Sequence, residues 1–120
     1  MTSPSPRKRV EVEEIGDVTV AWLTDRKVLE AAHIEAVGDQ LTALVNDPAR
    51  KKLVVNFDKV EFMSSAALGM LVTLQRKARA AAVKLVLCGI DPQILEVFKL
   101  TKLDKQFVIR ADDQEALQAF

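Results

Sequence analysis

Apolar and polar residues alternate in the first part of the chain. The alternation runs through residues 10–15 and continues in residues 18–23, and Gly16-Asp17 separates the two runs. Alternation with a period of two is typical of a β-strand, and a Gly-Asp pair between two such runs is typical of a tight turn. The pattern therefore predicts a β-hairpin.

The next two apolar patterns have helical spacing. In the first, apolar residues fall on one helical face, and Asp47-Pro48 ends the helix. The members of this face are Ile34, Val37, Leu41, Leu44 and Val45. Residues 66–82 predict a longer helix because they are rich in Ala, Leu, Met, Gln, Lys and Arg and contain no proline. Its inward stripe is predicted to hold Ala67, Leu71, Leu74, Ala78 and Ala82, whereas Gln75, Arg76, Lys77 and Arg79 are expected to face water.

Three short apolar runs predict the remaining strands, at residues 53–57, 84–90 and 107–109. A short helix is expected around residues 94–98, and a terminal helix over residues 112–120, whose first turn carries three carboxylates. The predicted order is therefore β, β, α, β, α, β, α, β, α. Strands that alternate with helices after a hairpin indicate an α/β fold with a mixed, mostly parallel sheet and helices packed against it.

The length and composition predict a single domain. A chain of 120 residues, 49% of them hydrophobic, can bury a core of its own. Residues 1–9 hold two Ser-Pro pairs followed by three consecutive cations. Such a composition buries too little apolar surface to order itself, so we expect a disordered tail there and a folded domain over residues 10–120.

The charge balance and the residue counts argue against several classes of function. Seventeen basic and seventeen acidic side chains leave no net charge that would attract nucleic acid or anionic lipid. The apolar runs are too short for a membrane span, and the N-terminal cations are not followed by the apolar region of a signal peptide. One Cys and one His are too few for a disulfide or a structural zinc site. We therefore expect a cytoplasmic protein without metal or cofactor.

The candidates for catalysis are weak. His33 is expected on the surface of the first helix, and Cys88 lies inside an apolar strand, where a thiol acts as a small hydrophobic group. The four glycines form no phosphate-binding motif, and Ser65 is followed by two alanines rather than by the Ser-x-Gly of a hydrolase. The sequence therefore favours a protein that is not an enzyme.

Ser64 and Ser65 stand where a loop meets the longest predicted helix. A serine at this place can cap the helix by accepting a hydrogen bond from a free backbone N–H, which is worth about 1 kcal/mol. The same free N–H groups and the helix dipole also suit a phosphoserine. Both roles are open from the local sequence.

Residues 54–69 resemble the signature of the STAS family, the bacterial anti-sigma factor antagonists. In this family a strand leads through an Asp-containing loop, here with Asp58, to a serine motif at the start of a helix. The resemblance extends to the order of strands and helices and to residues 84–90, which a helix follows, so it covers about residues 10–120. It implies the STAS fold for this whole region.

The resemblance also implies a function and a set of partners. Such antagonists, when unphosphorylated, sequester an anti-sigma factor that is a serine kinase with a histidine-kinase-like ATPase fold. Phosphorylation of a motif serine releases this kinase, and a serine phosphatase would restore binding.

The motif implies which residues carry these roles. Aligned on Leu68-Gly69, the second serine of the family falls on Ala66, so we expect the phosphate on Ser65 first and on Ser64 second. The expected contact residues are Asp58, Met63, Ser64, Ser65, Ala66, Ala67 and Met70. An acidic residue that the family carries near the first helix corresponds to Asp25 or Glu30.

Two alternatives stay open. The domain could be a constitutive interaction or scaffold subunit of a signalling or transport assembly, without a phosphorylation switch, and Ala66 favours this hypothesis. It could also be an enzyme or nucleotide-binding protein that uses Ser65, but the sequence shows no base that would activate this serine.

Overall fold

The computed structural model describes residues 9–120 and begins with the predicted hairpin. Strands β1 (Val10–Ile15) and β2 (Val18–Leu23) pair antiparallel along their whole length, from Val10 opposite Leu23 to Ile15 opposite Val18. Gly16 in the turn has φ of 62°, a conformation that glycine adopts without strain. The prediction of this hairpin is confirmed.

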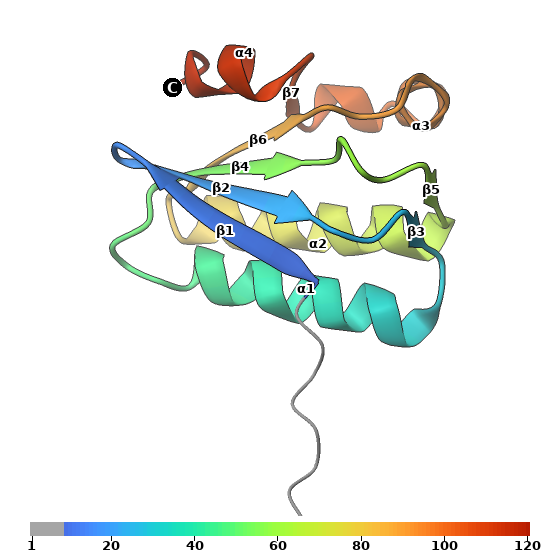
Figure 1. Cartoon of the computed structure of the whole chain (residues 1–120), viewed down its shortest axis with the longest axis horizontal. Coiled ribbons are helices and arrows are strands. Elements are labelled where there is room, and N and C mark those ends of the chain that lie inside the picture. Colours follow the sequence, from blue (N-terminus) through green and yellow to red (C-terminus); the bar gives the residue numbers. More distant parts are fainter. Residues whose placement is uncertain (1–8) are drawn as a thin grey trace, which may run out of the picture.

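The hairpin forms one edge of a five-stranded sheet (Figure 1). The other strands are β4 (Lys52–Asn56), β6 (Lys84–Cys88) and β7 (Val108–Arg110), and the order across the sheet is β1-β2-β4-β6-β7. Every neighbouring pair from β2 to β7 is parallel. The expected α/β class with a mixed, mostly parallel sheet is therefore confirmed.

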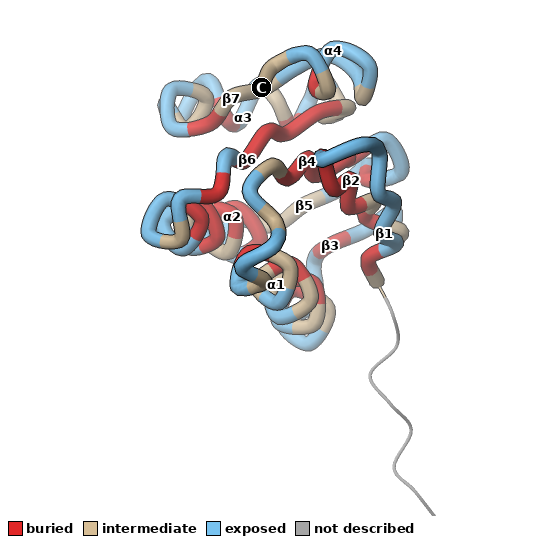
Figure 2. Tube along the Cα trace, turned by 90° about the vertical axis from the view of Figure 1, so that its left-hand side faces the viewer, coloured by how far each residue is buried: buried red, intermediate tan, exposed pale blue. Residues whose placement is uncertain are grey.

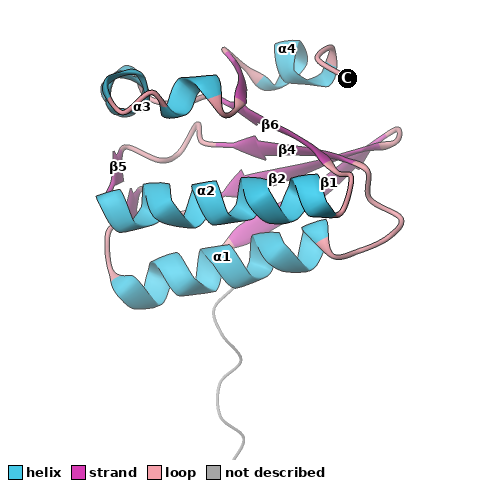
Figure 3. Cartoon of the chain, turned by 180° about the vertical axis from the view of Figure 1, so that it is seen from behind, coloured by secondary structure: helices cyan, strands magenta, loops and turns pink. Residues whose placement is uncertain are grey.

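The helices lie on both sides of this sheet. Helices α1 (Ala31–Val45) and α2 (Ser65–Ala80) run side by side against one face, as Figure 3 shows from behind. Helix α4 (Asp113–Leu117) covers the opposite face, and α3 (Pro92–Leu100) packs near β7 through the rings of Phe98 and Phe107. A short 3₁₀ helix (Leu103–Lys105) connects α3 to β7. Among residues 9–120, no helix is both long and apolar enough to cross a membrane.

Two hydrophobic cores explain why the central strands are apolar on both faces. Leu53, Val55 and Leu87 point into the larger core, toward α1 and α2. Val54 and Val86 point the other way, into a smaller core that Ala116 of α4 closes. Figure 2 shows this buried layer between the exposed outer surfaces of the helices. Because both faces are covered, these strands lack the polar alternation of the hairpin.

A second, two-stranded sheet was not expected from the sequence. Strands β3 (Lys27–Val28) and β5 (Phe62–Met63) pair in parallel just before α1 and α2. Each strand has only two residues and lies in a polar stretch, so it leaves no alternation in the sequence. This small sheet determines where the two helices begin.

Three expectations about single residues were wrong. Arg9, assigned to the tail, is placed in the structure, where its guanidinium lies 2.8 Å from Asp25. Ala82 lies beyond the end of α2 with φ of 59° and is exposed, so it is not part of the inward stripe. Gln75 is buried rather than facing water, because its side-chain amide donates to the backbone oxygen of Gln106 at 2.6 Å. The rest of the expected tail, residues 1–8, lies outside the described residues.

Candidate functional site

The two serines of the motif have different environments at the start of α2. Ser64 is the N-cap residue, and its Oγ accepts a hydrogen bond from the backbone N–H of Ala67 at 3.2 Å. Ser65 is the first residue of the helix and its side chain is exposed, whereas Ser64 is half-buried. The capping role is thus taken by Ser64, and the hydroxyl of Ser65 is accessible.

The small β3–β5 sheet positions this helix start. The backbone N–H of Ser64 donates to the oxygen of Val28 at 3.2 Å, and the N–H of Glu61 donates to the oxygen of Arg26 at 2.8 Å. Because β3 leads into α1 and β5 leads into α2, both helices begin at the same end of the molecule (Figure 3). The positive ends of two helix dipoles therefore lie on the same side of the site.

Most of the predicted contact residues are accessible. Ser65 and Ala66 are exposed, and Met63, Ser64 and Met70 are partly exposed. Ala67 is an exception, since its side chain is 0% exposed in the larger core. A partner cannot touch Ala67 in this fold, so its assignment as a contact residue was wrong.

Asp58 is exposed in the loop that follows β4. Its backbone N–H donates to Oδ1 of Asn56 at 2.8 Å, at the carboxyl end of β4. Its carboxylate lies so close to Gly89 that a Cβ on this glycine would be 2.2 Å from Oδ1. Among residues 9–120, no hydrogen bond or ion pair joins Asp58 to Ser64 or Ser65. Asp58 therefore lies between the carboxyl ends of β4 and β6, whereas the N-cap bond of α2 is made by Ser64.

An apolar hollow beside the start of α2 was not predicted from the sequence. It has a volume of about 220 Å³ and includes Met63 and Leu68 from the motif and Ile94 from α3. Its rim carries three large apolar side chains that are unusually exposed, Leu29 at 47%, Phe62 at 44% and Val97 at 41%. They come from three separate segments of the chain, so no local sequence pattern predicts the hollow. We call it the α3-side hollow.

A second groove lies between α1 and α2. Its volume is about 320 Å³, and Ala66 and Met70 line it together with Ile34 of α1. Ala66 and Met70 thus face this groove, while Met63 faces the α3-side hollow. Apolar contact surface therefore lies on both sides of Ser65.

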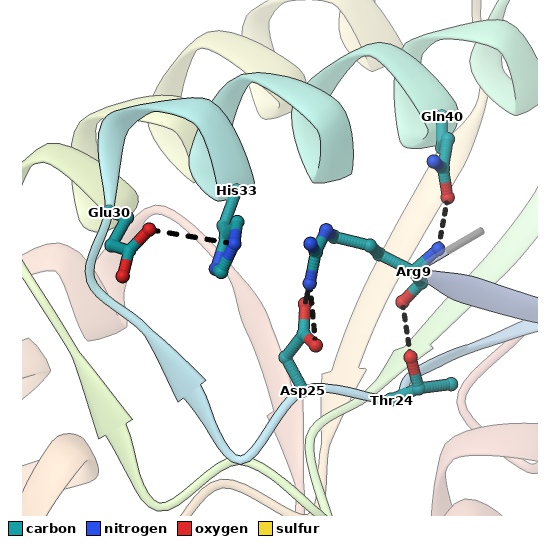
Figure 4. Close-up of polar contacts among 6 residues, drawn as sticks. All are labelled: Arg9, Thr24, Asp25, Glu30, His33 and Gln40. Carbon is teal, nitrogen blue, oxygen red and sulfur yellow. Dashed lines mark hydrogen bonds and ion pairs between the residues drawn. The ribbon is translucent and has the colours of Figure 1, made fainter. Parts of the chain in front are cut away.

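The two acidic candidates near α1 have different partners (Figure 4). Both carboxylate oxygens of Asp25 accept hydrogen bonds from Arg9 at 2.8 Å. Glu30 precedes α1, makes no side-chain cap, and lies 3.6 Å from Nε2 of His33. Asp25 therefore holds the start of β1 in place, whereas Glu30 stays on the surface with His33.

Cys88, the one cysteine of the sequence, is buried in the smaller core. Burial, followed by the nearby charges of Asp58, Asp113 and Asp112, raises the pKa of the Cys88 thiol to about 12. Cys88 is thus a core residue, as predicted. Within residues 9–120, no group of three or more His, Cys, Asp and Glu side chains lies close enough together to hold a metal ion.

Comparison with known proteins agrees with this architecture. The STAS domain model matches residues 9–116. A relative from Bordetella bronchiseptica, named "Putative anti-sigma factor antagonist BtrV", is 25% identical over 112 residues, which are 93% of this chain and 94% of the relative.

Solved structures share the fold. An anti-sigma factor antagonist from Mycobacterium paratuberculosis superposes with a TM-score of 0.81 at 24% identity, covering 98% of this chain and 97% of that one. The phosphorylated form of SpoIIAA, described as a Bacillus cell fate determinant, superposes with a TM-score of 0.68 at 21% identity, covering 91% of this chain and 96% of the other.

Proposed function

Because the chain belongs to the STAS domain family, we propose that it is an anti-sigma factor antagonist whose binding is switched by phosphorylation of Ser65. The observation that carries the proposal is an exposed serine at the first position of α2, next to a serine that already caps the helix. The relatives described above carry the name of anti-sigma factor antagonists. We assign this chain the same role, without enzymatic activity.

The geometry favours Ser65 over Ser64 as the phosphate acceptor. The oxygen of Ser64 accepts the bond that caps α2, so phosphorylation there would disturb the cap. Ser65 is exposed, and a phosphate on it would lie at the positive end of the helix dipole. The helix can therefore accept a phosphate on Ser65 without losing its N-cap.

A phosphate on Ser65 would weaken docking through its charge. It adds about 1.5 to 2 negative charges. A partner that covers the α3-side hollow, together with the exposed Phe62 ring and the methyl groups of Leu29 and Val97, would gain mostly by burying apolar surface. It would then have to desolvate the phosphate as well, which opposes binding. The unphosphorylated protein is the binding form in this scheme.

The partners follow from the family resemblance. The bound protein would be an anti-sigma factor that is itself a serine kinase with a histidine-kinase-like ATPase fold, and a serine phosphatase would reset the switch. Such partners act on transcription in the cytoplasm, where we place this protein.

The first experiment is a phosphosite map of the intact protein isolated from its own cells under two growth conditions. We expect one phosphate, on Ser65, whose occupancy changes with the condition. A protein that stays unmodified in both conditions would contradict the switch and favour the constitutive subunit. A phosphate on Ser64 alone would contradict the assignment to Ser65.

A binding measurement with variants completes the test. We expect Ser65→Asp to weaken binding of the purified kinase and Ser65→Ala to bind but to resist release by ATP. Gln114→Asp adds the same charge at an exposed position of α4, on the other face of the sheet, and should behave like the unchanged protein. Equal binding by Ser65→Asp and Ser65→Ala would refute the switch at this residue.

A further inference from the structure

Two apolar hollows lie on either side of Ser65, and they differ in charge. The α3-side hollow has one charged residue in its lining, Glu61, whose carboxylate is already paired with Arg26. The groove between α1 and α2, which we call the α1–α2 groove, has Glu35 and Asp39 in its lining. Within residues 9–120 neither of these two carboxylates forms an ion pair. The α1–α2 groove therefore combines apolar surface with unpaired negative charge.

The shape of the α1–α2 groove suits a helix. α1 and α2 run side by side (Figure 3), and the groove follows α1 from Ala31 to Thr42, which is about 16 Å or three helical turns. The two helices approach closely, since a Cβ on Gly38 would lie 3.0 Å from Cγ of Met70. The buried side chains in the lining are Ile34 and Leu74. A groove of this length between two helices accepts the apolar face of an amphipathic helix.

The charges of α1 are unfavourable for this helix alone. Glu35 and Asp39 are four residues apart, so their carboxylates stand one turn from each other on the same side of the helix. Like charges at this spacing weaken a helix, and α1 contains no Lys or Arg that would offset them. A cationic partner that covers the groove would remove this repulsion and would also bury the apolar surface.

We propose that the α1–α2 groove binds an amphipathic helix of a partner protein that carries Lys or Arg beside its apolar face. The apolar face would cover the buried lining of the groove, and the cations would meet Glu35 and Asp39. Lys77 also lines the groove, and its ammonium group donates to Oγ1 of Thr42 at 3.4 Å. Because this positive charge lies at the far end, the cations of the partner helix belong along the first two turns of α1.

This binding differs from the proposed docking of the kinase in its response to charge at Ser65. Ser65 precedes Ala66, which lines the groove. A negative charge on Ser65 adds to the acidic character of the groove and so favours a basic helix. The same charge opposes apolar docking on the α3-side hollow. The proposal rests on the groove alone and does not depend on a phosphate on Ser65.

An NMR titration of the isotope-labelled full chain with two synthetic peptides tests the proposal. Both peptides are amphipathic helices with leucines at positions i, i+3, i+4 and i+7, and they carry either lysines or glutamates beside the leucine face. We expect the lysine peptide to shift the amide signals of Gly38, Ala66 and Met70. It should bind about ten-fold more tightly than the glutamate peptide and lose affinity as the salt concentration rises. Equal binding of the two peptides, no binding of the lysine peptide, or shifts confined to the α3-side hollow would overturn the proposal.

Variants of the chain identify the charges involved. Glu35→Gln combined with Asp39→Asn removes both carboxylates and should weaken binding of the lysine peptide about five- to ten-fold. The matched control, Glu11→Gln combined with Glu13→Gln, removes two exposed carboxylates of β1 outside the groove and should bind like the unchanged chain. Ser65→Asp should bind the lysine peptide at least as tightly as the unchanged chain.

Three results would contradict this assignment. Unchanged binding by the variant without the two groove carboxylates would show that they are not recognised. Weaker peptide binding by Ser65→Asp would show that the groove does not favour cations, whatever this variant does to the kinase. If the groove signals shift with chain concentration in the absence of peptide, the occupant is a second copy of this chain rather than a partner helix.

Discussion

Ser64 and Ser65 are chemically identical neighbours, but the backbone gives them separate roles. Ser64 is extended, with ψ of 167°, and its hydroxyl caps α2, while Ser65 has already entered the helix. A loss of the cap removes one hydrogen bond to the first turn, whereas within residues 9–120 the Ser65 hydroxyl makes no hydrogen bond that its loss could remove. The helix cap and the proposed switch thus lie on different residues of the same motif.

This division predicts unequal effects of two alanine substitutions. Ser64→Ala should lower the free energy of unfolding by about 1 kcal/mol, because the N–H of Ala67 loses its acceptor. Ser65→Ala is the matched control and should change it by less than about 0.5 kcal/mol. Urea denaturation followed by circular dichroism measures both values. Equal destabilisation by the two substitutions would contradict the assignment of the cap.

Gly89 is a position where only glycine fits. Its φ is 68°, and a Cβ would meet Oδ1 of Asp58 at 2.2 Å. Gly89→Ala should therefore destabilise the protein by more than about 1 kcal/mol, because it adds backbone strain to a clash. Gly69→Ala is the control in the middle of α2, where a Cβ meets nothing within 4 Å, and it should stabilise the protein. Thermal unfolding of both variants distinguishes them, and a neutral Gly89→Ala would contradict the close approach.

Cys88 should be chemically silent in the folded protein. It is 0% exposed and its pKa is raised to about 12, so very little thiolate exists at neutral pH. We expect Ellman's reagent to label it only after denaturation. The variant Ser65→Cys in a Cys88→Ala background places a thiol at the exposed start of α2 and should react at once without denaturant. Rapid labelling of native Cys88 would show that α4 does not cover the smaller core.

At the level of elements, the strands and helices whose hydrophobic residues recur with a regular period could be predicted from the sequence. The hairpin, α1, α2 and the central strands each carry enough periodic residues to identify them, and Ser64-Ser65 marks a helix start. Strands β3 and β5 have two residues each and were missed. Gln75 was misassigned because its partner, the backbone oxygen of Gln106, is 31 residues away. The burial of a single residue depends on such distant neighbours, and the local hydrophobic periodicity carries no information about them.

The candidate site shows the same limit. Its serines were identified from the motif, but the α3-side hollow was not, because Leu29, Phe62 and Val97 are brought together only by folding. The motif also placed Ala67 among the contact residues, although the helical periodicity had predicted it in the inward stripe. The periodicity was right, because one helical step of 100° from the exposed Ala66 turns Ala67 into the core. A motif therefore indicates the chemistry of a site, while the surface around it requires the tertiary structure.

For the whole molecule, parallel strands need long connections, and polar contacts help to fix these connections. One such network joins the hairpin to the segment before β4. Thr19 Oγ1 donates to Glu14 at 2.9 Å, Arg50 donates to Thr19 at 2.7 Å, and Arg50 also forms an ion pair with Glu14. Residues 36 positions apart are thereby linked at one end of the sheet. The network makes the stability of the fold dependent on the charge of Glu14.

This dependence predicts a loss of stability in acid. The hydrogen bonds from Arg50 and Thr19 hold the pKa of Glu14 below its ordinary value of 4.5. A carboxyl group with a lowered pKa in the folded state stabilises the protein above its ordinary pKa, and this contribution disappears as the pH falls through the lowered value. The free energy of unfolding should therefore fall as the pH drops below 4.5. Because Glu14 is largely exposed, its share is small, about 0.2 to 1 kcal/mol.

Denaturation of two glutamine variants between neutral and acidic pH isolates this contribution. Glu14→Gln should be less stable than the unchanged chain at neutral pH and approach it in acid, since both then lack the charge. Glu13→Gln, on the same strand but without an ion pair within residues 9–120, should run parallel to the unchanged chain at every pH. If the Glu14→Gln difference stays constant with pH, the ion pair with Arg50 does not stabilise the fold, and the connection before β4 is held by its packing alone.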